Sequence, residues 1–171
     1  MPIKTSVTAL IFCLSVTGCV QQQTGNHMPS PAAIEKATDL SFNAFYKSSV
    51  GPLGLEPSAK LLSLNGKRVH IRGLMVLESA PVPGLLMLTP VPVNIPETED
   101  GAAADDLPGA TVYVHLPSRD ADKIPAYRPG LWDFTGILQL GAKEEANGRV
   151  SYLRLSLEQD ANLPTTVSKP E

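Results

Sequence analysis

Residues 68–77, RVHIRGLMVL, open with an alternation of polar and apolar side chains that strongly limits the possible folds. Val69, Ile71, Gly73, Met75 and Leu77 fall on one side of this segment, and its cationic residues fall on the other. A period of two predicts a half-buried strand. Gly73 inside the strand predicts a bend where a small barrel turns a corner.

Four further segments predict strands of the same kind, at residues 85–89, 111–116, 131–140 and 150–157. In the segment 111–116 the alternation places Val112, Val114 and Leu116 inward and Tyr113 and His115 outward. Ala146-Asn147-Gly148 precedes the last strand and is predicted to form a hairpin turn, of which the Asn-Gly pair is typical.

Five short antiparallel strands, two of them with an internal glycine, indicate a mainly β domain. We expect a small five-stranded OB-like barrel, with a small β-sandwich as the alternative. A short N-terminal helical arm is predicted to precede it. Ser30 followed by Pro31 can start a helix over residues 32–36, and residues 57–62 can form one or two further helical turns.

The chain begins with a basic residue, Lys4, followed by a mostly apolar run that is far shorter than the ~20 residues of a membrane-spanning helix. The run ends in LSVTGC at residues 14–19 and resembles the lipobox of bacterial lipoproteins. The resemblance implies a signal peptide at residues 1–18, cleavage before Cys19, and acylation of Cys19. Val20 stands where an aspartate would imply retention in the inner membrane, so we expect the periplasmic face of the outer membrane.

The rest of the chain divides by composition. Residues 19–30 are predicted to be a flexible tether, residues 31–159 the barrel domain, and residues 160–171 a disordered tail. Within the domain, residues 92–110 are rich in Pro, Ala and acid, and predict a mobile solvated loop. Calcium-loop spacing is absent from it.

Net charge and cysteine content exclude two further classes of function. Loss of Lys4 with the leader changes the formal net charge from −3 to −4, because all 17 acidic residues remain. Binding to nucleic acid would need a basic surface, so we expect none. Cys13 leaves with the leader and Cys19 carries lipid, so no thiol is left for a disulfide, a nucleophile or a metal site.

The strand segments also resemble a family of bacterial envelope proteins of unknown function. The resemblance covers residues 40–157 and rests on LNGKRVHIRGLM at 64–75, LLMLTPVP at 85–92, VYVHLP at 112–117, PGLWDFTGIL at 129–138 and EANGRVSYLRL at 145–155. It implies a periplasmic or lipid-anchored protein with an OB-like barrel. Some members occur beside ABC-type export systems, which implies an accessory role in transport. The cysteines of that family are absent here, so no metal or redox role is carried over.

No catalytic motif is present in the sequence, and we expect a protein that is not an enzyme and has no cofactor or metal. A cationic and aromatic surface on the outward faces of the strands is the candidate site for a partner or ligand. Its members are Arg68, His70, Arg72, Tyr113, His115 and Arg154. Two functions stay open. The first is a membrane-anchored, non-enzymatic accessory or protein-binding module in an envelope or transport complex, for example an ABC-type exporter. The second is a lipoprotein that binds a small anion through the arginines, or a metal if His70 and His115 converge.

Overall fold

The computed structural model describes residues 36–52, 54–98, 101–102, 107–158 and 166–167. The predicted signal peptide 1–18, the lipidation site Cys19 and the tether 19–30 lie outside the described residues. The predicted helix at 32–36 also lies outside them, apart from Lys36, which is not helical. Among the described residues, no helix has the length and apolar character needed to cross a membrane.

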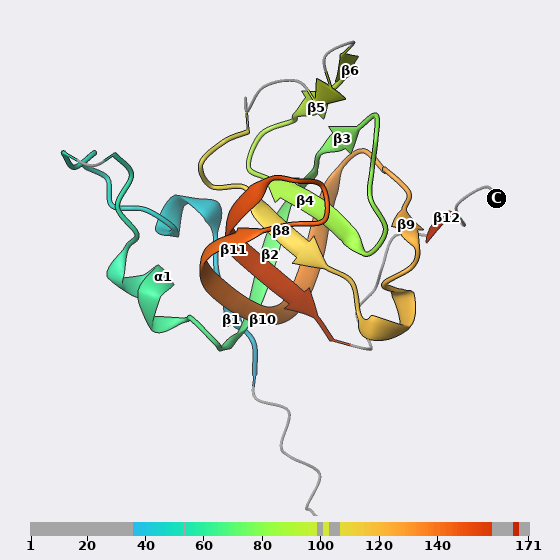
Figure 1. Cartoon of the computed structure of the whole chain (residues 1–171). Coiled ribbons are helices and arrows are strands. Elements are labelled where there is room, and N and C mark those ends of the chain that lie inside the picture. The colour runs from blue at the N-terminus through green and yellow to red at the C-terminus, as the bar shows by residue number, and fades with distance from the viewer. Residues whose placement is uncertain (1–35, 53, 99–100, 103–106, 159–165, 168–171) are drawn as a thin grey trace, which may run out of the picture. The chain divides into compact units, whose positions relative to one another are not determined.

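Five strands wrap around one interior and close on themselves (Figure 1). Around the ring the order is β2, β10, β11, β8 and β4, and β4 pairs back with β2. The strands are β2 (Arg68–Met75), β4 (Leu85–Thr89), β8 (Val112–His115), β10 (Leu131–Glu144) and β11 (Val150–Leu157). The ring confirms the predicted mainly β, five-stranded OB-like fold, and a two-sheet sandwich is not formed.

One pairing in the ring differs from the antiparallel arrangement that the sequence predicted. β8 and β11 run parallel, with Val114 opposite Leu155, whereas the other four pairings of the ring are antiparallel. The parallel pair arises because the chain crosses the ring between β8 and β10 instead of returning by a tight turn. This order, with one parallel pair, is that of an OB-type Greek-key barrel.

The long strand β10 serves two neighbours. Its first half pairs with β2, and its second half pairs with β11. Gly136 lies where the two pairings overlap, and a Cβ there would come within 2.3 Å of the Ser156 carbonyl oxygen. Glycine is therefore required for β10 to bend tightly against β11.

The interior of the ring is filled by the inward residues that the alternation predicted. Val69, Ile71, Val112, Val114 and Phe134 are each at most 1% exposed. Burial of such side chains is the main stabilising contribution in a domain of this size.

The N-terminal arm adds to this core. Leu40 and Phe45 are buried in it, and β1 (Thr38–Asp39) pairs in parallel with β2. The arm continues through the 3-10 turn η1 (Phe42–Ala44) to α1 (Ala59–Ser63), close to the predicted 57–62. Ser58 caps α1 by accepting a hydrogen bond from the Leu61 amide.

The outer face of β4 and β8 is covered as well, and this corrects two predictions. Leu85, Met87 and Tyr113 point away from the ring interior, yet they pack in a second apolar cluster beneath Val93 and Ile95. Tyr113 was predicted to be exposed but is only 5% exposed. Part of the predicted mobile loop 92–110 is therefore packed, because its apolar residues seal the face on which Tyr113 lies.

Two short strands lie beside the cover over the outer face of β4 and β8. They are β3 (Leu77–Glu78) and β5 (Asn94–Ile95), and they pair in parallel. Leu77 was predicted to continue the buried face of β2, but the strand ends at Met75 and Leu77 is 38% exposed. β6 (Glu97–Thr98) and β7 (Gly101–Ala102) form a small antiparallel pair in the same loop.

The chain after β8 forms the 3-10 turn η2 (Ser118–Asp120) and the strand β9 (Ile124–Pro125). β12 (Thr166–Val167) pairs with β9, which the prediction of a disordered tail at 160–171 did not include. The other residues of that tail lie outside the described part of the chain.

Candidate functional site

The outward faces of β2 and β10 carry a row of polar side chains whose neighbours are set by the strand register. His70 and Arg72 are two residues apart on β2, so they share the outward face. The register places Thr135 opposite His70 and Asp133 opposite Arg72. These four residues, His70, Arg72, Asp133 and Thr135, are called the rim network below.

Every member of the rim network has a partner. Arg72 Nε donates to Asp133 Oδ1 at 2.7 Å, and Arg72 Nη2 donates to Asp133 Oδ2 at 3.0 Å. His70 Nε2 lies 3.1 Å from Asp133 Oδ1, and His70 Nδ1 lies 3.0 Å from Thr135 Oγ1. Both ring nitrogens of His70 therefore have a polar partner, one a carboxylate oxygen and the other a hydroxyl.

The charges of the rim network stabilise one another. The hydrogen bond from Arg72, together with the charges of Arg72 and His70, holds the pKa of Asp133 below its ordinary value despite partial desolvation. The same hydrogen bond, with the charges of Asp133 and Asp39, raises the pKa of Arg72. Because a bidentate Asp133 occupies the guanidinium fork, an external anion would have to displace it.

A groove of about 580 Å³ opens beside the rim network. The N-terminal arm contributes Leu40 and Phe42, Gly73 contributes backbone, and Leu131 of β10 stands 67% exposed at the edge. A Cβ on residue 73 would come within 2.8 Å of the Phe42 ring, so glycine is needed for this close packing. The groove therefore combines apolar side chains with the paired charges of the rim network and with the polar arm residues Asp39, Ser41 and Asn43.

The remaining cations predicted for the site also have partners. Arg68 forms an ion pair with Glu158, with 2.8 Å between Nη2 and Oε2. Arg154 is only 7% exposed, and its Nη1 donates to the Gly141 carbonyl oxygen at 2.6 Å and to Ser151 Oγ at 3.0 Å. Arg154 thus joins β11 to the irregular part of β10 near Gly141 and is not an exposed ligand contact.

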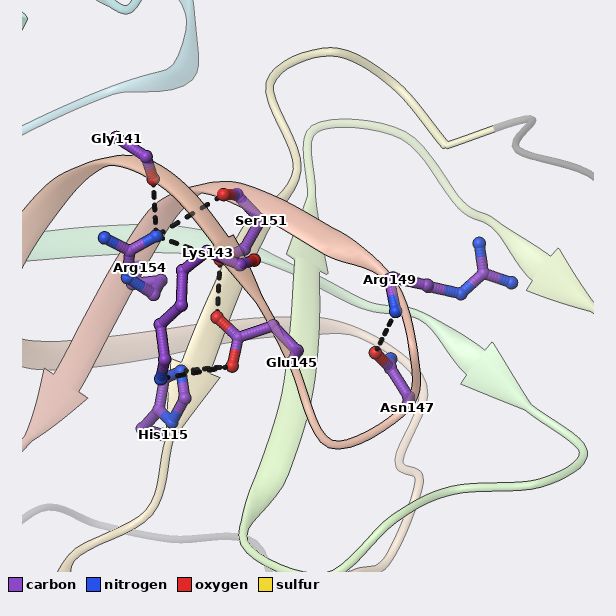
Figure 2. Close-up of polar contacts among 8 residues, drawn as sticks. All are labelled: His115, Gly141, Lys143, Glu145, Asn147, Arg149, Ser151 and Arg154. Atoms are coloured by element: carbon purple, nitrogen blue, oxygen red, sulfur yellow. Dashed lines mark hydrogen bonds and ion pairs between the residues drawn. The ribbon is translucent and has the colours of Figure 1, made fainter.

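His115 belongs to a different cluster, drawn in Figure 2. Its Nε2 lies 3.1 Å from Glu145 Oε2, and Ser151 Oγ donates to the other oxygen of the same carboxylate. Burial alone would raise the pKa of Glu145. The hydrogen bond from Ser151 and the charges of His115 and Lys143 outweigh burial and hold the pKa below its ordinary value.

Figure 2 shows these side chains converging from β8, β10 and β11 onto the Glu145 carboxylate. The β10–β11 hairpin turns immediately after Glu145, where Gly148 donates its amide to the Glu145 carbonyl oxygen. The turn occupies residues 146–148, as the sequence predicted, and Gly148 supplies a positive φ of 75°. The cluster ties the hairpin to β8.

The predicted site residues do not form one surface. His70 and His115 lie on β2 and β8, which are not neighbours in the ring, and each contacts a different acidic residue. Within the described residues, no group of three or more His, Cys, Asp or Glu side chains is placed to hold a metal ion. The arrangement that the metal alternative required is therefore absent from this part of the chain.

The cations of this surface were predicted from the sequence, but their acidic partners were not. Asp133 and Thr135 alternate with Trp132 and Phe134, so their outward position could be predicted. Their pairing with Arg72 and His70 could not, because it depends on β10 being the neighbour of β2 in one particular register. No sequence pattern marked Glu145 as a candidate site residue, because its burial depends on the closure of the hairpin over β8.

Comparisons with known proteins add little to this geometry. No family model matches the chain, and no curated protein is significantly similar to it. Among solved structures, a DUF3299 family protein from Pseudomonas aeruginosa matches with a TM-score of 0.42 and 11% sequence identity. The match covers 80% of this chain and 99% of the other, and at this level of similarity it carries no argument about function.

Proposed function

We propose that this chain is a lipid-anchored protein of the bacterial envelope whose OB-like ring docks a protein partner in the groove beside Leu131. In this role it is a non-enzymatic accessory module of an envelope or transport complex. The observation that carries the proposal is the groove itself: exposed apolar surface borders a rim network whose charges are already neutralised. Such a site favours an apolar side chain of a protein over a free anion.

The anchor is supported by the sequence LSVTGC, which ends at Cys19. Nineteen peptide units connect Cys19 to Thr38, where the arm joins β2. At 3.3–3.6 Å per residue this connection spans at most about 68 Å. The groove is lined by the same arm, so a partner that binds there is held near the membrane. Val20 after the acylated residue favours the outer membrane.

Acylation is tested by comparing the full chain with its Cys19→Ser variant. We expect the unchanged chain to fractionate with membranes and its mature N-terminal peptide to carry diacylglycerol and an amide-linked acyl chain by mass spectrometry. The Cys19→Ser chain should lack both modifications. An unmodified N-terminus at Cys19 in the unchanged chain would refute the anchor.

Docking is tested by placing a charge in the groove. Leu131→Glu should reduce the partner that copurifies with the detergent-solubilised protein by at least about tenfold, because a carboxylate must be desolvated against apolar surface. Leu62→Glu is the matched control, since Leu62 lies on α1 outside the groove and is 57% exposed. Equal recovery with both variants would show that the groove is not the docking site.

A further inference from the structure

A second, smaller cavity lies between the outer cluster and β9, away from the groove. Its volume is about 240 Å³, and its walls include Leu85, Ile124 and Pro125. An enclosed cavity of about 150 Å³ is large enough for benzene in another protein, so this one has room for a group of several heavy atoms. The cavity shares no lining residue with the groove beside Leu131.

Glu78 is one of the residues that line this otherwise mostly apolar cavity. Glu78 follows Leu77 in β3, and Tyr127 is the other titratable side chain in the lining. Among the described residues, no hydrogen bond or ion pair to the Glu78 carboxylate is formed. A half-buried carboxylate without a donor is an unfavourable arrangement that a bound cation would relieve.

Electrostatics agree with this geometry. Burial raises the pKa of Glu78 to about 7, although the charge of Arg149 acts in the opposite direction. The side chain is therefore about half ionised near neutral pH. A ligand that brings a positive charge would favour the ionised form, and its binding would release a proton from the protonated fraction.

We propose that this cavity binds a protonated primary amine on a short apolar stem. In this proposal the ammonium group donates to the Glu78 carboxylate and the stem packs against Pro125 and Ile124, while Tyr127 is an aromatic neighbour in the same lining. A free alkylamine and a lysine side chain of another protein share this chemistry. The site is independent of the groove beside Leu131 and does not need that groove to be occupied.

The test is a titration of the full chain, carrying Cys19→Ser, with butylammonium at pH 8, followed by the NMR signal of the side-chain Cδ of residue 78, which is a carboxyl carbon in the unchanged protein and a carboxamide carbon in Glu78→Gln. We expect saturable binding that Glu78→Gln weakens by at least about tenfold, because the charge-assisted hydrogen bonds are lost. Glu144→Gln is the matched control, since Glu144 is exposed and outside the cavity. It should leave the affinity unchanged.

A second measurement uses pH. Between pH 8 and pH 6 the ionised fraction of a group with a pKa of about 7 falls roughly tenfold. The apparent affinity for butylammonium should fall by about the same factor.

A third arm separates the two sources of the amine. Binding of blocked lysine amide with an affinity similar to that of butylammonium supports a lysine side chain as the occupant, and binding of butylammonium alone supports a small free amine. The proposal would be overturned if neither butylammonium nor blocked lysine amide binds. It would also be overturned if Glu78→Gln and the unchanged chain bind butylammonium equally well. None of these outcomes depends on partner docking at Leu131.

Discussion

Replacing Glu78 with glutamine should stabilise the protein at neutral and alkaline pH and have no effect in acid. Glutamine has nearly the same shape as glutamate but no charge, so the apolar walls around residue 78 no longer oppose ionisation. Burial raises the pKa of Glu78 from 4.5 to about 7. This difference of about 2.5 units corresponds to at most about 3.4 kcal/mol. Because the side chain is partly exposed, solvent screening lowers the expected gain to about 1–3 kcal/mol.

The sign follows from proton binding. Below about pH 4.5 residue 78 is protonated in both the folded and the unfolded states, so the substitution changes nothing through charge. Between about pH 4.5 and 7 the folded state holds more protons than the unfolded state, and the stability of the unchanged protein falls as pH rises. Above about pH 7 the folded protein bears the full free-energy cost of holding Glu78 in its ionised form. The advantage of Glu78→Gln should therefore grow from near zero at pH 4 to its maximum at pH 8.

The assay is urea unfolding of the full chain with Cys19→Ser, followed by fluorescence of Trp132, the one tryptophan in the sequence. Glu144→Gln, which removes an exposed carboxylate, should show a small difference that does not vary in this way with pH. A difference for Glu78→Gln that is equal at pH 4 and pH 8, or a destabilised variant at pH 8, would refute the assignment of a half-buried carboxyl without a hydrogen-bond donor.

Three further perturbations follow from the contacts. Glu145→Ala should lower the free energy of unfolding by about 3 kcal/mol in the same urea assay, because it removes one partner of a buried charge cluster. A loss below about 0.5 kcal/mol would contradict the role of Glu145 as the shared partner in that cluster. Gly136→Ala should cost roughly 2–3 kcal/mol, since the new methyl group meets the Ser156 carbonyl oxygen, and an unchanged urea midpoint would show that the two strands are not so close. Arg72→Gln should raise the pKa of Asp133 toward its ordinary value, measured by carboxyl-carbon NMR, and an unchanged pKa would contradict their bidentate contact.

The ring could be predicted from the sequence because its strands follow a period of two. β4 and β11 have the predicted limits, 85–89 and 150–157. The inward residues of β2 and β10 are those that the alternation selects, and Gly136 marks a close backbone approach. These features are local, so one segment at a time suffices to find them.

Other features depend on which segments meet. The run LLML at 85–88 is apolar on both sides, which is typical of a strand covered on both faces. That signal could have predicted a cover over Tyr113, but it does not identify residues 93–95 as the cover. Arg68 and Arg72 were predicted to be open to ligands for a similar reason: their acidic partners lie 90 and 61 residues further along the chain.

The central claim, that a lipid-anchored ring docks a protein partner at the groove, is tested most directly by photocrosslinking in intact cells. A photoreactive amino acid replaces Leu131 in one variant and Leu62 in another, each with the unchanged Cys19. The account predicts one defined adduct from position 131, no such adduct from position 62, and loss of the adduct when Cys19→Ser removes the anchor. No adduct from position 131, or the same adduct from both positions, would contradict it.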